Sequence, residues 1–155
     1  DTDISNLRYG KICILADADS DGLHIATLLC ALFLRHYKNL VTSGKIFVSM
    51  PPLYRIDAAK EVFYALDENE KESIVKKIKK QNSKIKIDIQ RFKGLGEMNP
   101  SQLRETVMKP ESRRLVQLTL SSSDNANSVF DLLLSKKRAP DRKEWLEKKG
   151  NLAEI

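Results

Sequence analysis

Three aspartates at alternate positions are the residues of this chain whose type and spacing most clearly suggest chemistry. Asp17, Asp19 and Asp21 follow one another at positions i, i+2 and i+4, and Gly22 comes directly after them. In an extended segment this spacing points all three carboxylates to the same side. Carboxylates so close together repel one another unless a cation joins them or one of them takes up a proton. Such hard oxygen ligands suit Mg²⁺. We therefore predict a magnesium site, with Mn²⁺ or Ca²⁺ as substitutes.

Three other interpretations of the aspartates stay open. The pattern D-x-D-x-D-G also opens an EF-hand calcium loop, but such a loop needs a bidentate glutamate at its twelfth position, where this chain has Leu28. Simple surface acidity at the end of a strand is the second interpretation. The third is a general acid/base pair without metal, which would need a carboxylate in an apolar pocket that nothing in the sequence predicts.

Two further segments carry residue types that contact phosphate. His24 lies two residues after Gly22, near the start of a predicted helix, where a phosphate would sit at the helix N-terminus. A structural histidine is the alternative there. The glycines of Lys93-Gly94-Leu95-Gly96-Glu97 permit close approach of a phosphate to the backbone, and Lys93 would neutralise it. For this segment the alternative is a tight turn that joins a strand to a helix.

The elements that must position these residues alternate between strand and helix. The apolar run from Ile12 to Ala16 ends in Asp17 and predicts a strand buried on both faces, as in a parallel sheet. Residues 23–40 are apolar almost all round in their first turns and predict a helix packed on that sheet. The aspartates would then lie beyond the carboxyl end of a strand, where α/β proteins bind their ligands.

The rest of the chain continues this pattern. Pro51-Pro52 marks a corner, because proline cannot donate to a strand ladder. We expect strands at residues 45–50, 62–66, 85–89 and 115–120, and helices at residues 67–81, 100–108, 124–134 and from 140 to just before 150. The predicted fold class is α/β, with a parallel sheet flanked by helices and a C-terminal helical tail.

Composition predicts a folded domain with an acidic partner. The 155 residues are 41% hydrophobic and carry a formal net charge of +6, which excludes disorder, collagen-like and disulfide-scaffold classes. Residues 1–34 have a net charge of −3, whereas residues 76–93 have +7, and a second basic cluster lies at residues 136–143. The lysines of residues 76–86 would form either a solvated face or DNA contacts. We expect no membrane span and no signal peptide, and hence a cytoplasmic protein.

Two long motifs resemble the Toprim domain in the B subunits of bacterial type II topoisomerases. Residues 9–25 contain D-A-D-S-D-G and resemble the metal motif of that domain, and residues 90–100, Q-R-F-K-G-L-G-E-M-N-P, resemble a second signature of the family. The segments P-P-L-Y-R at 51–55 and P-E-S-R-R at 110–114 also match, so the resemblance covers nearly the whole chain. The tail at residues 132–142 is similar to the topoisomerase IV type of B subunit. The gyrase type is the alternative, although many Gram-negative gyrase B subunits carry a large insertion before this tail.

The resemblance implies a Toprim-like, Rossmann-like sheet and Mg²⁺-dependent cleavage and religation of DNA. It implies Asp17 and Asp19 as metal ligands, Asp21 as a weaker or water-mediated one, and Arg142 as a DNA contact alongside His24 and Lys93. A solvated charge run is the alternative for Arg142. The implied partners are double-stranded DNA and the topoisomerase IV A subunit, which supplies the nucleophilic tyrosine in an A2B2 tetramer. That ATP-hydrolysing enzyme relaxes and decatenates DNA during chromosome segregation and associates with the nucleoid.

The family's metal site also includes a glutamate from an E-G-D-S-A motif, which acts as general acid/base in the family and which does not occur in this chain. We therefore expect the isolated chain, which also lacks the family's ATPase and transducer domains, to be catalytically inactive. The expected divisions are a Toprim core at residues 1–55, a helix-strand extension at 56–92, and the K-G-L-G-E loop with the helical tail at 93–155. Two competing functions are a non-catalytic basic DNA-binding module and a Toprim nuclease or primase, which would lack the second signature and the tail.

Overall fold

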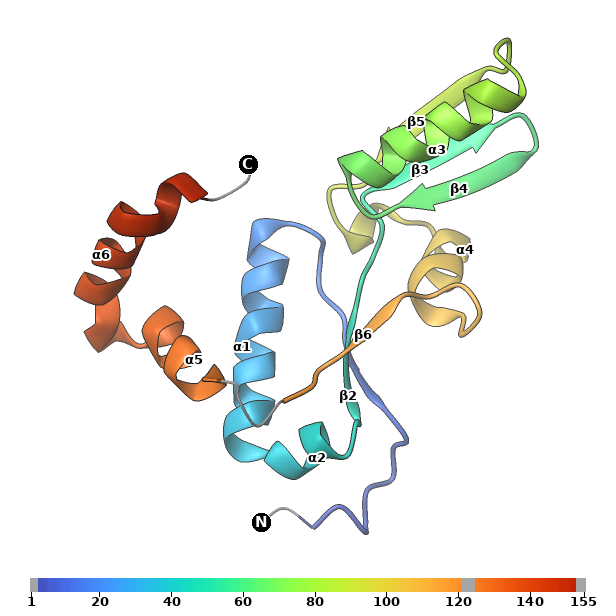
Figure 1. Ribbon diagram of the computed structural model, residues 1–155. Coiled ribbons are helices and arrows are strands. Elements are labelled where there is room, and N and C mark those ends of the chain that lie inside the picture. Colours follow the sequence, from blue (N-terminus) through green and yellow to red (C-terminus); the bar gives the residue numbers. More distant parts are fainter. Residues whose placement is uncertain (1–2, 121–124, 153–155) are drawn as a thin grey trace.

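The computed structural model describes residues 3–120 and 125–152, and these residues form an α/β fold with two small sheets (Figure 1). The strands are β1 (Ile12–Ile14), β2 (Ile46–Ser49), β3 (Tyr54–Ala58), β4 (Glu61–Ala65), β5 (Ile87–Arg91) and β6 (Leu115–Gln117). The helices are α1 (Ser20–His36), α2 (Lys38–Thr42), α3 (Glu68–Gln81), α4 (Pro100–Leu103), α5 (Ala126–Leu134) and α6 (Ala139–Lys149). Shorter helical turns are η1 (Leu95–Glu97), η2 (Arg104–Met108), η3 (Lys136–Arg138) and η4 (Gly150–Leu152). The predicted α/β class is confirmed.

The first sheet carries the strand that leads to the aspartates. Its order is β1-β2-β6, with β1 parallel to β2 and β6 antiparallel to β2. Helices α1 and α2 connect the two parallel strands, and the strands and helices share one hydrophobic core, which includes Ile14, Leu34, Val41 and Ile46. The parallel arrangement predicted from the apolar run is therefore present for one strand pair. The predicted burial on both faces is wrong, since Cys13 is exposed, and β1 stops at Ile14.

Helix α1 differs from the single helix predicted at residues 23–40. It begins earlier, at Ser20, because Asp19 caps it, and it ends at His36. Tyr37 then leaves helical geometry with a φ of −134°, and α2 follows as a separate short helix. Asp124, which we expected to begin the helix that corresponds to α5, lies outside the described residues.

The second sheet and α3 form an arm, defined as residues 54–91, that projects away from α1 (Figure 1). Its order is β4-β3-β5, and both strand pairs are antiparallel. Ile56, Ala58 and Ala65 from the sheet pack with Ile78 of α3 in a core of their own. Strand β3 was not among the predicted elements, although Tyr54, Ile56 and Ala58 alternate with polar residues as a half-buried strand requires.

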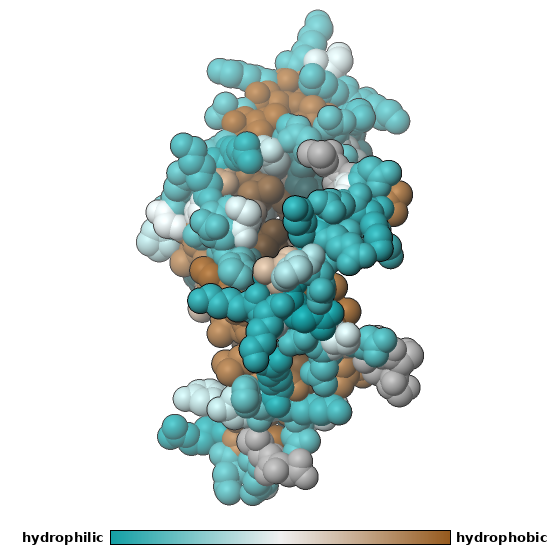
Figure 2. Space-filling model, turned by 90° about the vertical axis from the view of Figure 1, so that its left-hand side faces the viewer, coloured by the Kyte–Doolittle hydropathy of each residue, from teal (hydrophilic) through white to brown (hydrophobic). Residues whose placement is uncertain are grey.

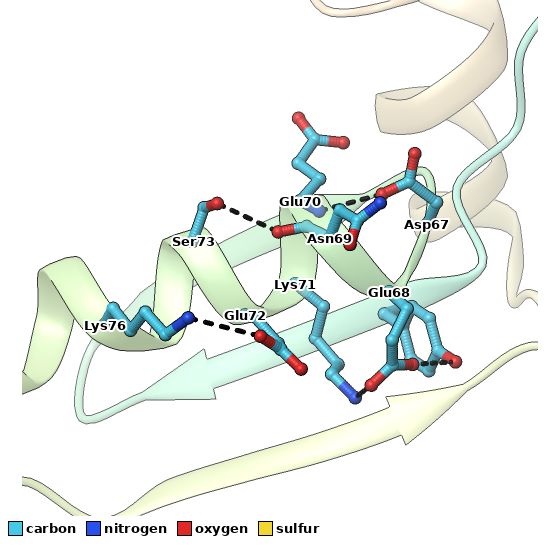
Figure 3. Close-up of polar contacts among 9 residues, drawn as sticks. Asp67, Glu68, Asn69, Glu70, Lys71, Glu72, Ser73 and Lys76 are labelled. Atoms are coloured by element: carbon cyan, nitrogen blue, oxygen red, sulfur yellow. Dashed lines mark hydrogen bonds and ion pairs between the residues drawn. The ribbon is translucent and has the colours of Figure 1, made fainter.

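Helix α3 starts as its sequence predicts, and Figure 3 shows its first turns. The Asp67 carboxylate accepts a hydrogen bond from the Glu70 backbone N–H at 2.8 Å, which satisfies one of the donors that a helix start leaves unpaired. Glu68 is paired with Lys71 and accepts from the Tyr54 hydroxyl at 2.7 Å. The acidic residues of α3 thus lie in its first turns, toward the base of the arm, whereas Lys76, Lys77, Lys79 and Lys80 lie in its second half, toward the tip.

Helix α4 begins at the predicted Asn99-Pro100 boundary. The Asn99 side chain accepts from the Gln102 N–H and the Gln102 side chain accepts from the Asn99 N–H, both at 2.9 Å, which is a reciprocal capping box. The helix then continues into the π-helical turn η2, whose Thr106 and Val107 are buried. This segment begins three residues after residues 93–97, which we call the glycine loop.

The face of the molecule seen in Figure 2 is mostly hydrophilic, with hydrophobic patches between the hydrophilic side chains. Helix α1 contributes several exposed apolar side chains, Leu23, Ile25, Leu28 and Leu32. Although α1 is apolar almost all round, the described residues cover only part of its surface. None of the helices in the described part is both long and apolar enough to cross a membrane.

Candidate metal centre

The three aspartates border one shallow depression at the start of α1. Its volume is about 380 Å³, and Asp17, Asp19 and Asp21 line it together with Leu95 from the glycine loop. The predicted extended alternation ends at Asp19, because α1 begins at Ser20 and Asp21 belongs to its first turn. The three aspartates therefore border one depression, but in the described residues their carboxylates do not converge on one point as the alternation predicted, because Asp21 belongs to the helix.

Asp19 has a structural task as well as a candidate chemical one. It is the N-cap of α1, and its Oδ1 accepts a hydrogen bond from the Gly22 N–H at 2.7 Å. A negative charge at this position is favoured by the helix dipole. Asp21, in the first helical turn, has the same favourable position relative to the dipole. The start of α1 therefore stabilises the negative charges of Asp19 and Asp21, two of the three predicted metal ligands.

Gly22 lies against the backbone of Asp17. A Cβ at position 22 would lie 2.0 Å from the Asp17 carbonyl oxygen and 2.8 Å from its nitrogen. No side chain fits there unless the backbone moves. Gly22 thus allows the first turn of α1 to pack directly against the backbone of Asp17.

The carboxylate of Asp17 rests on the glycine loop, residues 93–97. Its Oδ1 accepts a hydrogen bond from the Leu95 N–H at 2.7 Å, across 78 positions of sequence. A Cβ on Gly94 would lie 3.1 Å from Cγ, Oδ1 and Oδ2 of Asp17. Within the loop, the Lys93 N–H donates to the Glu97 carboxylate at 2.7 Å, and residues 95–97 form the turn η1. The tight turn considered for this loop is thus present, and it contacts an aspartate.

These residues fit part of a magnesium site. Within residues 3–120 and 125–152, no three histidine, cysteine or acidic side chains converge on a point that a metal ion could occupy. In the same part of the chain, the hydrogen bonds to Asp17 and Asp19 reach only one oxygen of each carboxylate, Oδ1. Their Oδ2 atoms are hard oxygen ligands of the kind that Mg²⁺ prefers. The remaining coordination would come from water, from Asp21 or from groups beyond the described residues, so the metal site stays a prediction.

The three DNA candidates lie on different elements. His24 is exposed on α1, close to the aspartates in sequence, and the Lys93 side chain is exposed at the start of the glycine loop. Arg142 lies on α6, where its Nη1 donates to the carbonyl oxygens of Leu132 and Ser135 at 2.9 and 2.7 Å. Arg142 therefore closes the C-terminal end of α5. For all three residues, contact with DNA stays a prediction.

The contact between Leu95 and Asp17 was not foreseen from the sequence. The glycines of the loop were its signal, because they indicate close approach to the backbone, but the group expected to approach was a phosphate. A backbone amide gives no signal of its own in a sequence. Only the fold shows that residues 17 and 95 meet.

A second, larger depression lies between β4 and the turn η2. It has a volume of about 480 Å³, and its described lining residues include Tyr64, Glu105 and Arg114. The Tyr64 hydroxyl donates to Glu105 Oε2 at 3.1 Å. Burial and, after it, the bond to the Glu105 carboxylate raise the pKa of the Tyr64 phenol. None of the residues predicted to bind metal or DNA lines this depression in the described part of the chain.

Comparison with known proteins identifies the family. The family model for the carboxyl terminus of the DNA gyrase B subunit matches residues 84–147. The B subunit of DNA topoisomerase 4 from Haemophilus influenzae is 64% identical over 157 residues, and that from Pseudomonas aeruginosa is 62% identical over 154 residues; each alignment covers 99% of this chain and 24% of the relative. The B subunit of DNA gyrase from Thermotoga maritima is 43% identical over 148 residues, which cover 96% of this chain and 22% of the relative.

The chain thus spans about a quarter of the length of the curated relatives that it matches. The similarity nevertheless extends over almost all of its own residues, including both motifs found above. The resemblance noted from those motifs is confirmed. The chain belongs to the B-subunit family of type II DNA topoisomerases, and its high-identity relatives include the B subunits of DNA topoisomerase 4.

Proposed function

We propose that this chain is the part of a topoisomerase IV B subunit that contributes magnesium ligands for cleavage and religation of double-stranded DNA. The observation that carries the proposal is the depression that Asp17, Asp19 and Asp21 line between the end of β1 and the first turn of α1, with Leu95 of the glycine loop bonded to Asp17. The position of these carboxylates, between the carboxyl end of a strand and the start of a helix, supports the proposal, because α/β proteins bind their ligands there.

Asp17 and Asp19 are the proposed direct metal ligands, and Asp21 acts through water. Each of the first two holds one carboxylate oxygen in a backbone hydrogen bond and leaves the other for the cation. When bound, Mg²⁺ would stabilise the negative charge that develops at the scissile phosphate and its leaving oxygen. Lys93 would neutralise a neighbouring phosphate, and His24 and Arg142 would contribute further DNA contacts.

The other groups of the reaction would come from elsewhere in the assembly. The nucleophilic tyrosine would belong to the A subunit, and the general acid/base would be a glutamate of the B subunit outside these residues. ATP would bind to a different part of the B subunit. In this proposal the active enzyme is an A2B2 tetramer that works on chromosomal DNA in the cytoplasm.

Decatenation tests the proposal. The full-length B subunit that contains this sequence, combined with its A subunit, should separate linked DNA circles when Mg²⁺ and ATP are present. The identity of 61–64% to the B subunits of several topoisomerase 4 enzymes, against 43% to that of a gyrase, supports decatenation over supercoiling as the main activity. Introduction of negative supercoils by the same tetramer would instead favour gyrase. DNA binding without strand passage or cleavage would favour a non-catalytic DNA-binding module.

A further inference from the structure

We propose that the backbone of Gly94 and Leu95 positions the Asp17 carboxylate for metal binding. The inference rests on the proposed metal-binding role of Asp17. It assigns to the glycine loop a task that differs from contact with phosphate, because the loop would act on the metal ligand.

The first support is the hydrogen bond itself. A carboxylate turns easily about its last side-chain torsion, since that torsion has a broad energy profile. The Leu95 N–H, at 2.7 Å from Oδ1, fixes this torsion and leaves Oδ2 without a hydrogen bond from the described residues. Carboxylates that bind metals are commonly held by such partners, and loss of a partner typically costs about 10- to 100-fold in metal affinity.

The second support is the absence of a side chain at Gly94. Its φ of −170° is extended backbone that any residue adopts, so backbone freedom does not explain a glycine here. What the position requires is space, because a Cβ would lie 3.1 Å from three atoms of the Asp17 carboxyl group. An alanine would press on the carboxylate and shift it by some tenths of an ångström.

The third support is the rigidity of the loop. Phe92, directly before it, is 1% exposed, and its N–H donates to the Leu53 carbonyl at 2.8 Å. The bond from the Lys93 N–H to Glu97 closes the loop, and buried Met98 anchors its far end. The Leu95 amide is therefore held in place from both sides, and so is the carboxylate that it binds.

Two alanine variants of the full-length B subunit separate this task from a general effect on the loop. Gly94→Ala adds a methyl group against Asp17, whereas Gly96→Ala adds the same group where no atom lies within 4 Å. Binding of Mn²⁺ alone is measured by electron paramagnetic resonance. We expect Gly94→Ala to weaken Mn²⁺ binding by about 10-fold or more and Gly96→Ala to leave it unchanged. Equal affinities of the two variants would overturn the inference.

Cleavage of DNA by the reconstituted tetramer gives a second measurement. Gly94→Ala should need a higher Mg²⁺ concentration for half-maximal cleavage and should recover near-normal cleavage at saturating Mg²⁺. DNA affinity in the presence of a chelator should not change. If Gly94→Ala instead weakened DNA binding in chelator and left Mn²⁺ affinity intact, the loop would act on phosphate and the inference would be wrong.

A variant at Glu97 covers the case in which Gly94→Ala does not fold. Glu97→Ala removes the acceptor that closes the loop, and Glu97→Gln keeps an acceptor oxygen at the same place. We expect weaker Mn²⁺ binding from the first than from the second, and equal binding would count against the inference. Asp17→Asn in the same assay tests the underlying proposal separately. If it bound Mn²⁺ as the unmodified protein does, the metal role of Asp17 itself would fail.

Discussion

At the scale of single residues, the chemistry depends on side chains that also hold the backbone together. Asp19 caps α1, and Asp17 bonds to Leu95. The alternating aspartates led to the magnesium prediction, because their type and spacing are visible in the sequence, and that prediction stays to be tested. The capping of α1 by Asp19 was not predictable, since it depends on where the helix begins. The hydrogen bond from Leu95 to Asp17 was not predictable either, since it joins residues far apart in the sequence.

Asp19 offers a way to separate capping from metal binding. Asparagine caps helices about as well as aspartate, so Asp19→Asn should keep the free energy of unfolding while it weakens Mn²⁺ binding. Asp19→Ala should lose both and destabilise the protein by about 1 kcal/mol. Denaturant unfolding and Mn²⁺ titration of the two variants measure these effects. Equal destabilisation by both variants would contradict the capping role of Oδ1.

Gly22 should tolerate no side chain. Gly22→Ala places a Cβ 2.0 Å from the Asp17 carbonyl oxygen, so α1 or the backbone of Asp17 must shift. Overpacking of this kind costs about 1–3 kcal/mol of unfolding free energy, occasionally more. Gly10→Ala is the matched control, because no atom lies within 4 Å of its added methyl group. Thermal unfolding of both variants is the measurement, and an unchanged midpoint for Gly22→Ala would refute the close approach.

At the scale of elements, hydrophobic periodicity predicted which helices and strands exist better than it predicted where they begin and end. Strands β2, β4 and β5 and helices α3 and α6 appear within a few residues of the predicted ranges. The strand expected at 12–16 is shorter because Asp19 starts α1 so soon, and the arm's central strand β3 was missed beside the conspicuous Pro51-Pro52 corner. The predicted domain boundaries near residues 55 and 92 stay predictions.

The arm leads to a prediction about DNA binding. Lys79, Lys80, Lys84 and Lys86 are exposed, and they follow the end of α3 that lies away from its acidic first turns. If they meet phosphates, replacing all four by glutamine should weaken DNA binding and reduce the slope of log affinity against log salt by about 0.9 for each lost contact. Glutamine at Lys38 and Lys109, two other exposed lysines, is the control. An unchanged slope would identify the run as a solvated face.

At the scale of the whole molecule, the two sheets have separate cores, and the candidate metal centre lies where their segments meet. Asp17 follows β1 of the first sheet, whereas Leu95 follows β5 of the arm. The α/β class was predictable from apolar runs and helix caps. The contact between Asp17 and Leu95 was not predictable, because no local sequence pattern indicates it. An extended parallel sheet of the Toprim type also stays a proposal, since the described residues contain one parallel strand pair.

The central claim is that Asp17 holds a metal ion that DNA cleavage requires. Asp17→Asn is a specific change, because asparagine keeps one acceptor oxygen for the Leu95 N–H, replaces the other oxygen by an NH2 group and removes the negative charge. Asp88→Asn, at an exposed aspartate of the arm, is the matched control.

Double-strand cleavage of a linear duplex by the reconstituted A2B2 enzyme, at fixed Mg²⁺, tests this claim most directly. We expect Asp17→Asn to lower cleavage on the order of 100-fold, the scale of a lost electrostatic partner of the transition state. DNA binding should be retained, and Asp88→Asn should cleave normally. Normal cleavage by Asp17→Asn would contradict the claim.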